Sequence, residues 1–315
     1  MTLVTIIIPC YNAALFIENA LSSVLVQSHS DIECLIVDDC SEDNSKEIVE
    51  RLSFGDTRVR LIRQKENMGA SSARNVGIAE ARGAYVTFLD ADDAYEKNRI
   101  ELLLGLANST DADIVVDNQS VRWFPNGTHT FEAFPFLSGH SQLQLTQELF
   151  FANAASSIRS LSVGFMKPMY RRAFLERERI RFDTNISVGE DFCMLARAVV
   201  STQKFFGHGD STYIYYRRRG SLSFSKKVPL AAMATDCEAL LTELKPLLSQ
   251  TSQNLLYNRV LELNRMSDWG NVVEDIRAGR LISASTRLLK HPTLIGEVPK
   301  AAVRFFNHQR VKTNA

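Results

Sequence analysis

Three carboxylates, at Asp90, Asp92 and Asp93, lie within four residues. They directly follow a run of β-forming residues, Tyr85 to Leu89. Carboxylates this close repel one another and need a cation between them to stay ionised. Their hard oxygen atoms suit Mg²⁺ or Mn²⁺, and Mg²⁺ usually takes one or two carboxylates and completes its shell with water and substrate phosphates. The cluster therefore predicts a metal site that binds a phosphorylated ligand, and an acidic first turn of a helix over Asn98 to Ala107 is the competing explanation.

Three other predicted strands also end in polar residues. The segment after the second strand holds two adjacent carboxylates, Asp38 and Asp39, which need hydrogen-bond donors. The imide of a nucleobase and the hydroxyls of a ribose could supply those donors. Ordinary turns, or a helix cap at Asp43 or Asn44, are the alternative explanation for these segments. The three strand ends are Pro9-Cys10-Tyr11-Asn12, Asp38-Asp39-Cys40-Ser41-Glu42-Asp43 and Glu66-Asn67-Met68-Gly69.

The elements that must position these residues alternate between short strands and helices over the first 117 residues. The strands are continuously apolar, which indicates burial on both faces of a sheet. Strands that alternate with helices predict a mainly parallel, doubly wound sheet, in which ligands bind beyond the carboxyl ends of the strands. The predicted strands are Val4–Ile8, Ile32–Asp38, Val59–Ile62, Tyr85–Leu89 and Ile114–Asp117, and helical spacing covers Leu15 to Leu25, Ile48 to Leu52 and Ala70 to Ala81.

The pattern changes after Asp117. A β-hairpin is predicted from Val121 to Phe131, with its turn at Pro125-Asn126-Gly127. From about Pro229 onward only helical patterns remain, which places a domain boundary there. Between these points we predict helices at Thr146–Asn153, Arg171–Glu178 and Glu190–Val200, and a tyrosine-rich strand at Thr212–Tyr216.

The composition is that of a globular protein, with 315 residues of which 45% are hydrophobic and 23% charged. Lys plus Arg equals Asp plus Glu at 36 each, so no net field attracts nucleic acid. The five cysteines show no CxxC spacing and are expected to be reduced thiols of a cytosolic protein. The apolar run from Leu3 to Ile8 is too short for a signal peptide or a membrane span.

In order and spacing, these motifs resemble glycosyltransferase family 2. The resemblance covers residues 3 to about 225, with two departures. Cys40 replaces the glycine common in the second motif, and Asp93 adds an acid after the metal motif. The motifs are Pro9 to Asn12, Asp38 to Asp43, Asn67-Met68-Gly69, Ala73-Arg74-Asn75-Val76-Gly77, Asp90-Ala91-Asp92, Lys167-Pro168-Met169-Tyr170-Arg171-Arg172, Phe182, Gly189-Glu190-Asp191, Tyr216-Arg217 and Ser221-Leu222-Ser223.

The resemblance implies an α/β protein with a GT-A fold, which is a Rossmann-like, mainly parallel sheet that binds a nucleotide sugar. With the changes of pattern noted above, it places a catalytic domain over 1–228 and a helical C-terminal extension over 229–315. The catalytic domain would have a nucleotide-sugar-binding half over 1–117 and an acceptor-side half over 118–228.

For the donor, the resemblance implies Mg²⁺ or Mn²⁺ held by Asp92, with Asp90 assisting directly or through ribose and water. Arg74 follows Gly69 in the first turns of a helix, where N–H groups and a guanidinium favour an anion, and a solvated helix charge is the alternative. Arg217 is the implied clamp on the diphosphate. The implied donor-binding residues are Pro9, Tyr11, Asn12, Asp39, Asn67, Arg74, Asp90 and Arg217.

For the acceptor, the resemblance implies that Asp191 is the general base and that Glu190 orients the acceptor or a neighbouring side chain. Transfer to a hydroxyl needs such a base, because the alcohol loses its proton as it attacks. The competing explanation is that both acids only begin the helix that follows, where acids are favoured.

The C-terminal region is rich in basic residues interleaved with apolar ones. Such a surface can lie on anionic lipid, which predicts peripheral contact with the inner face of the cell membrane, near a lipid-linked acceptor. A helical cap with a solvated basic face is the alternative. The basic residues are Arg277, Arg280, Arg287, Lys290, Lys300, Arg304, Arg310 and Lys312.

The predicted function is an inverting, metal-dependent transfer of a sugar from a UDP-sugar to a glycan in exopolysaccharide or surface polysaccharide biosynthesis, with glucose as the first sugar to consider. A sugar-1-phosphate nucleotidyltransferase is one alternative, although Pro9 to Asn12 is not the glycine-rich loop such an enzyme would need. A non-catalytic scaffold of a polysaccharide-assembly complex is another. The clustered charges argue against it, because they are costly to keep without chemistry; the intact acids are Asp39, Asp90, Asp92 and Asp191.

Overall fold

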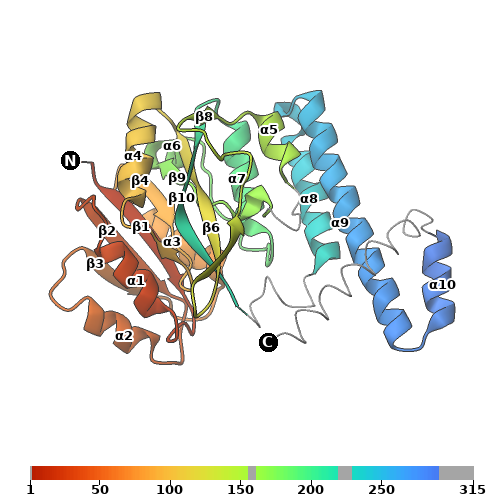
Figure 1. Ribbon diagram of the computed structural model, residues 1–315, viewed down its shortest axis with the longest axis horizontal. Coiled ribbons are helices and arrows are strands. Elements are labelled where there is room, and N and C mark those ends of the chain that lie inside the picture. Colours follow the sequence, from red (N-terminus) through yellow and green to blue (C-terminus); the bar gives the residue numbers. More distant parts are fainter. Residues whose placement is uncertain (1, 155–160, 219–228, 291–315) are drawn as a thin grey trace. The chain divides into compact units, whose positions relative to one another are not determined.

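The computed structural model describes residues 2–154, 161–218 and 229–290 (Figure 1). The chain divides into two compact units. The first unit comprises Met1–Val228 and Leu240–Leu256, and the second comprises Pro229–Ala239 and Tyr257–Ala315.

The first unit is built on a mixed sheet that is parallel at its N-terminal half, as predicted. Its strand order is β3-β2-β1-β4-β9-β6-β10-β5, with β7 paired to β6 and β8 paired to β10. Strands β1 to β4 are mutually parallel, and β6 is parallel to β10. The strands are β1 (Val4–Cys10), β2 (Ile32–Asp38), β3 (Val59–Arg63), β4 (Tyr85–Phe88), β5 (Ala94–Tyr95), β6 (Ile114–Trp123), β7 (Thr128–Glu132), β8 (Leu143–Gln144), β9 (Met169–Arg171) and β10 (Phe205–Arg217).

The predicted helices are present, with ends that differ by a few residues. Two strands are longer than predicted: Ile114–Asp117 and the first arm of the hairpin form the single strand β6, and β10 begins at Phe205 and not at Thr212. The short strands β5, β8 and β9 were not predicted, because two or three residues carry no periodicity that could reveal them. The helices are α1 (Ile17–Leu25), α2 (Ser45–Leu52), α3 (Ala70–Glu80), α4 (Arg99–Thr110), α5 (Gln147–Ala152), α6 (Arg172–Arg177), α7 (Glu190–Val200), α8 (Leu230–Leu244), α9 (Gln250–Arg277) and α10 (Leu281–Lys290), with short 3₁₀ turns η1 (Val163–Phe165) and η3 (Lys245–Leu247).

Alternate residues of β1 pack against different helices. The sheet with its helices is drawn in Figure 1. Ile6 and Ile8 belong to a buried cluster with the apolar faces of α1 and α4. Ile7 points to the other face and packs under α3. A Cβ on Gly77 of α3 would lie 2.4 Å from Ile7 Cγ2, so only glycine allows this close approach.

An antiparallel strand separates the two parallel parts of the sheet. Strand β9 lies between β4 and β6 and runs against both. Its register pairs Met169 with Thr87 and Tyr170 with Val86, so the residues before Met169 lie beside the carboxyl end of β4. The insertion brings a distant segment to the edge where the polar strand ends meet.

The second unit has a small apolar core of its own. Val272 and Ala284 are buried in it, with Trp269 and Leu288 packed against them. Next to this core, the buried carboxylate of Asp275 accepts hydrogen bonds from three side chains of the same unit. The donors are Arg280 at 2.8 Å, Arg287 at 2.9 Å and Ser283 at 2.8 Å.

These contacts modify the predicted basic surface. Arg280 and Arg287 share the single carboxylate of Asp275, so this group of three residues keeps one net positive charge while both arginine side chains stay exposed. Lys300, Arg304, Arg310 and Lys312 lie outside the described residues. Within the described part of the chain, no helix is long and apolar enough to cross a membrane.

Candidate active site

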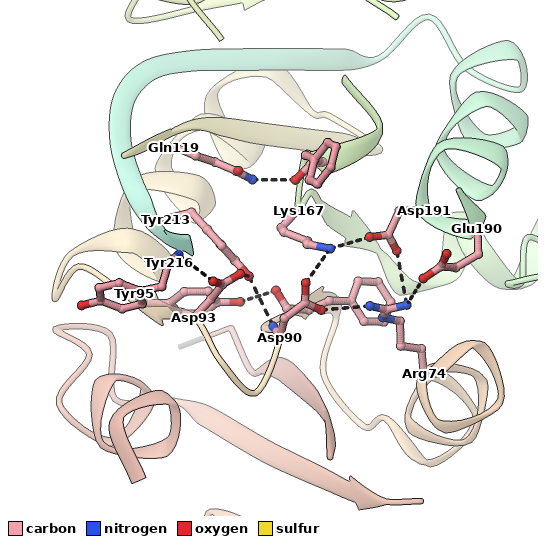
Figure 2. Close-up of polar contacts among 12 residues, drawn as sticks. Arg74, Asp90, Asp93, Tyr95, Gln119, Lys167, Glu190, Asp191, Tyr213 and Tyr216 are labelled. Atoms are coloured by element: carbon pink, nitrogen blue, oxygen red, sulfur yellow. Dashed lines mark hydrogen bonds and ion pairs between the residues drawn. The ribbon is translucent and has the colours of Figure 1, made fainter. Parts of the chain in front are cut away.

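The turn after β4 places its carboxylates in different surroundings. Asp93 points into the protein, where it accepts hydrogen bonds from the Tyr213 hydroxyl at 2.7 Å and the Tyr216 N–H at 2.9 Å (Figure 2). Burial, followed by the two neighbouring aspartates, raises the pKa of Asp93 well above its usual range. The suggestion that Asp93 caps a helix is wrong, because α4 begins only at Arg99.

Asp90 and Asp191 form a closed ring of ion pairs with two buried cations, Arg74 and Lys167 (Figure 2). One carboxylate oxygen of Asp90 lies 2.9 Å from Arg74, and the other lies 2.9 Å from Lys167. The two oxygens of Asp191 lie 3.4 Å from Arg74 and 2.5 Å from Lys167. We call these four residues the ion-pair ring. Since each carboxylate bridges both cations, the ring links the turn after β4 to the start of α7.

The ion-pair ring shifts the pKa values of its members away from what burial alone would give. Burial would raise the pKa of Asp90, but Lys167 and Arg74 together hold it well below its usual range. Burial would likewise lower the pKa of Lys167, and the carboxylates of Asp191 and Asp90 raise it. Asp90 and Lys167 are therefore both charged at neutral pH.

Lys167 was not predicted as a site residue. In the sequence it begins the motif that runs from Lys167 to Arg172, and a single lysine gives no local signal of burial. The register of β9 against β4 explains its place, because it sets Lys167 beside the turn that begins at Asp90. Its side chain is only 7% exposed.

Arg74 lies in the second turn of α3 and is buried, so a solvated helix charge is the wrong interpretation. Besides the ring contacts, its guanidinium lies 3.0 Å from Glu190 and 5.2 Å from the centre of the Phe182 ring. Its Nε has no hydrogen-bond partner among the described residues. The predicted contact between Arg74 and a donor diphosphate stays a prediction.

The two predicted acceptor-side acids begin α7, as the pattern indicated. Gly189 precedes them with φ of +90°, a left-handed conformation that favours glycine. Among the described residues Glu190 pairs only with Arg74, and burial followed by the charge of Asp191 raises the pKa of Glu190. Counting Glu190, three carboxylates thus face two cations at this edge of the sheet.

Asp92 lies apart from the ion-pair ring and pairs with Arg218. The Arg218 guanidinium lies 2.8 Å from the Asp92 carboxylate and 4.2 Å from the centre of the Phe16 ring. The neighbouring Arg217, predicted to clamp the diphosphate, lies 4.8 Å from the centre of the Phe131 ring. The structure therefore brings Arg218, and not Arg217, to the metal motif, and the clamp role of Arg217 stays a prediction.

At the end of β2, Asp39 is buried and receives its hydrogen bonds from the protein. The donors are the Gln64 amide at 2.5 Å and the N–H groups of Met68 and Gly69 at 2.8 and 2.7 Å. The turn before α3 is thereby tied to the end of β2. The protein itself thus supplies donors that a nucleobase or ribose could have supplied, and contact between Asp39 and a nucleoside stays a prediction.

The remaining predicted donor residues lie around the ends of β1 and β3. Pro9 is partly buried within β1, and Tyr11 just beyond it is half exposed. Asn12 has a left-handed φ of +48°, and its side-chain oxygen accepts a hydrogen bond from the Glu42 N–H at 2.9 Å. Asn67 is exposed. Tyr11 and Asn67 are therefore accessible to a ligand, and their roles stay predictions.

The donor set suits a metal held by a single carboxylate. Burial, and then the charge of Asp90, raises the pKa of Asp92, so the ionised form needs further positive charge. Both oxygens of Asp90 are already engaged by Arg74 and Lys167. No group of three acidic, histidine or cysteine side chains in the described part of the chain is arranged to hold a metal. A divalent ion at Asp92 would therefore take its other ligands from water and donor phosphates, as Mg²⁺ commonly does.

Known proteins share both the sequence and the fold. The family described as Glycosyl transferase family 2 matches residues 5–159. The succinoglycan biosynthesis protein ExoO of Rhizobium meliloti (strain 1021) is 31% identical over 290 residues, which cover 92% of this chain and 82% of ExoO.

Two solved structures are similar at lower identity, which shows the fold alone. S. aureus TarS 1-349 in complex with UDP-GlcNAc has a TM-score of 0.65 at 17% identity, over 93% of this chain and 92% of that chain. The mannosyltransferase PcManGT from Pyrobaculum calidifontis, in complex with GDP-Man and Mn²⁺, has a TM-score of 0.57 at 16% identity, over 96% of this chain and 86% of that chain. Taken with the likeness to ExoO, these findings show that the chain belongs to glycosyltransferase family 2 and is a glycosyltransferase with the GT-A fold.

Proposed function

We propose that this protein transfers a sugar from a UDP-sugar to a glycan, with inversion, in the biosynthesis of an exopolysaccharide or other surface polysaccharide. The observation that carries the proposal is the ion-pair ring, which holds the carboxylate of Asp191 beside that of Asp90. The likeness to ExoO, a succinoglycan biosynthesis protein, supports the polysaccharide assignment. TarS, solved with UDP-GlcNAc, supports the nucleotide.

In this proposal the acceptor hydroxyl attacks the anomeric carbon of the donor and gives its proton to Asp191. The contacts with Arg74 and Lys167 fix the position of the Asp191 carboxylate, which supports a role as base toward a hydroxyl bound beside it. The new glycosidic bond forms as the bond to the diphosphate breaks, and the electron pair leaves with the nucleoside diphosphate. Attack from the face opposite the leaving group inverts the anomeric centre.

The leaving diphosphate gathers negative charge, and this chain offers several cations to meet it. Asp92 would hold Mg²⁺ or Mn²⁺, and the bound ion would neutralise the diphosphate as it leaves. Arg218 already lies at Asp92 and can turn from that carboxylate to a phosphate, because guanidinium binds both in the same bidentate way. At the other end, Asp39, Tyr11 and Asn12 are the residues proposed to bind the nucleoside.

A panel of nucleotide sugars tests the donor. UDP-glucose is the first donor to try, followed by UDP-GlcNAc, the donor bound in TarS, and GDP-mannose, the donor bound in PcManGT. Hydrolysis without acceptor is measured with Mg²⁺, with Mn²⁺ and with a chelator. We expect metal-dependent release of UDP from a UDP-sugar. Turnover of none of these donors would favour the scaffold alternative, and turnover of sugar 1-phosphate with UTP would favour a nucleotidyltransferase.

Replacing the base gives the sharpest test of mechanism. Asp191→Asn should reduce transfer by about 10²-fold or more, the size of a general-base contribution, and leave metal-dependent donor binding nearly intact. Asp92→Ala should instead weaken metal-dependent donor binding. Full transfer by Asp191→Asn, measured with the accepted donor, would show that the base assignment is wrong.

We also propose a lipid-linked acceptor and a cytoplasmic location with peripheral contact to the inner membrane face. The basic composition of the C-terminal region supports this, although Arg280 and Arg287 are engaged by Asp275. Cosedimentation with anionic vesicles at low and high salt tests the contact. Binding that salt reverses would support it, and equal solubility at all salt concentrations with no vesicle binding would refute it.

A further inference from the structure

Lys167 bridges two carboxylates that the proposed reaction assigns to different substrates. Its Nζ lies 2.9 Å from Asp90, on the donor side, and 2.5 Å from Asp191, the proposed base (Figure 2). The side chain is 7% exposed, so the ammonium group has left bulk water to make these contacts. A buried lysine held between two acids is costly to place unless both contacts are kept.

The fold holds the backbone of Lys167 as firmly as its side chain. Its carbonyl oxygen accepts a hydrogen bond from Arg99 Nη2 at 2.6 Å. Arg99 is fully buried and makes two further hydrogen bonds to Asp117, at 3.0 and 2.9 Å. On the chain's other side, Met169 pairs with Thr87 in β4. The ammonium group is thus presented to the site from a rigid base, which is what a group that orients a catalytic side chain requires.

We propose that Lys167 is a positioning residue for the transfer step, which aims Asp191 at the acceptor hydroxyl and links it to Asp90 on the donor side. The inference rests on the proposed function, in which Asp191 is the base. Arg74 makes the matching bridge from the other side of the ion-pair ring but is shared with Glu190. In the described part of the chain, Lys167 pairs with Asp90 and Asp191 and with no other acid.

The charge balance of the step explains what this bridge contributes. The acceptor proton moves to Asp191, the bond from the acceptor oxygen to the anomeric carbon forms, and the electron pair of the broken bond leaves with the diphosphate. Asp191 is then neutral, while Lys167 and Arg74 keep their charges. The ion-pair ring therefore gains one positive charge beside Asp90 as negative charge develops on the leaving group, which stabilises the transition state.

Neutral and charged replacements of Lys167 test the inference. Lys167→Met should lower kcat for transfer by about 10²-fold and change the KM for the donor much less, because the loss falls on a step after binding. Lys167→Arg keeps the charge and should retain at least about a tenth of wild-type activity. In Lys167→Ala, ethylammonium should restore transfer and ethanol should not. If the role of Lys167 were purely structural, the variants would not lose kcat selectively, and ethylammonium would not restore transfer better than ethanol.

Two further variants separate the inference from the function on which it rests. In an Asp191→Asn background, adding Lys167→Met should reduce the transfer rate little further, because Lys167 acts through the Asp191 carboxylate. Lys204→Met is the matched control, since Lys204 pairs with Asp111 on the surface and should leave transfer unchanged. If Lys167→Met is too unstable to assay, Lys167→Gln replaces it. If Asp191→Asn is inactive but a neutral Lys167 variant is fully active, the positioning role of Lys167 is wrong and the proposed function stands. If Asp191→Asn is fully active, the proposed function with Asp191 as base is wrong.

Discussion

Two buried arginines of the first unit, Arg99 and Arg74, have different surroundings. Arg99 supports the fold, and Arg74 lies at the candidate active site. Arg99 is fully buried against a single acid, Asp117, and its guanidinium also lies 4.3 Å from the centre of the Tyr95 ring. Arg74 faces three acids and leaves its Nε without a hydrogen-bond partner among the described residues. The Arg99 cluster is balanced, with one acid for one arginine. The Arg74 cluster has more carboxylates than cations, and one N–H group of Arg74 has no hydrogen-bond partner among the described residues.

The same contrast appears between the two units. At the sheet edge, Glu190 is the surplus acid, and burial followed by the charge of Asp191 raises its pKa. In the second unit, Asp275 is one acid among two arginines and a serine, and hydrogen bonds from Ser283 and then Arg280 lower its pKa to about 2. Acids that outnumber cations are destabilised when charged, and acids outnumbered by cations are stabilised. A surplus of acid is therefore not expected in a cluster that serves only the fold.

The largest loss of stability should come from removing the arginine of the buried Arg99–Asp117 pair. Arg99→Met leaves Asp117 buried without its cation and should lower the free energy of unfolding by about 3–5 kcal/mol. Urea unfolding of both proteins, extrapolated to water, measures the difference. Arg58→Met is the control, because Arg58 and Asp56 form a partly exposed pair for which about 0–1 kcal/mol is expected. Equal losses of unfolding free energy in the two variants would contradict the distinction between buried and partly exposed ion pairs.

Removing Glu190, the surplus acid, should lower activity without lowering stability. The raised pKa of Glu190 means that its charged form is disfavoured in the folded protein, so the associated stability is present at low pH and lost as pH rises through the folded pKa. Glu190→Gln removes that loss and should unfold at pH 7 no more easily than wild type. Transfer should fall by about 10- to 100-fold, because Arg74 loses a contact that orients it.

Thermal unfolding at pH 5 and pH 8, together with transfer rates, measures both effects of Glu190→Gln. A variant that is clearly less stable than wild type at pH 8 would show that Glu190 supports the fold after all. The conclusion that surplus acid marks the site would then have to be withdrawn for this residue.

The sequence predicted those parts of the site that lie at the ends of regular elements. Asp39, Asp90 and Asp191 each follow or begin an element with a clear pattern, and the parallel sheet brings the strand ends together. Lys167 was missed as a site residue because its place depends on β9, three residues with no pattern of their own. Arg99 offers a similar lesson, since nothing local distinguishes a fully buried arginine at a helix start from a solvated one.

The ion-pair ring itself could not be predicted from spacing. Its members come from four separate segments of the chain, and the neighbouring contact between Arg74 and Glu190 joins residues 116 apart. Such contacts depend on the packing of α3, β9 and α7 around β4, which the periodicity of each segment does not encode. The same holds for the inward turn of Asp93, which depends on Tyr213 in a strand 120 residues further along.

The smallest expected effect concerns Asp275, and it should have the opposite sign to that of Glu190. Its pKa is lowered to about 2 in the folded protein, whereas an unperturbed aspartate titrates near 3.9. Its stabilising contribution is therefore complete above about pH 4 and is lost as pH falls towards 2. The chain has two tryptophans, so Trp123→Phe leaves Trp269, beside Val272 and Ala284, as the reporter of the second unit.

Fluorescence of Trp269 is followed from pH 6 to pH 2 in the Trp123→Phe protein and in the same protein with Asp275→Asn. Both should unfold in acid, because other carboxylates also titrate, but the Asp275→Asn protein should start from lower stability and lose less of it between pH 4 and pH 2. The difference between the two curves isolates the contribution of Asp275. Parallel curves would show that an acid outnumbered by arginines gains nothing from them here, and the contrast between the sheet edge and the second unit would reduce to a difference in burial.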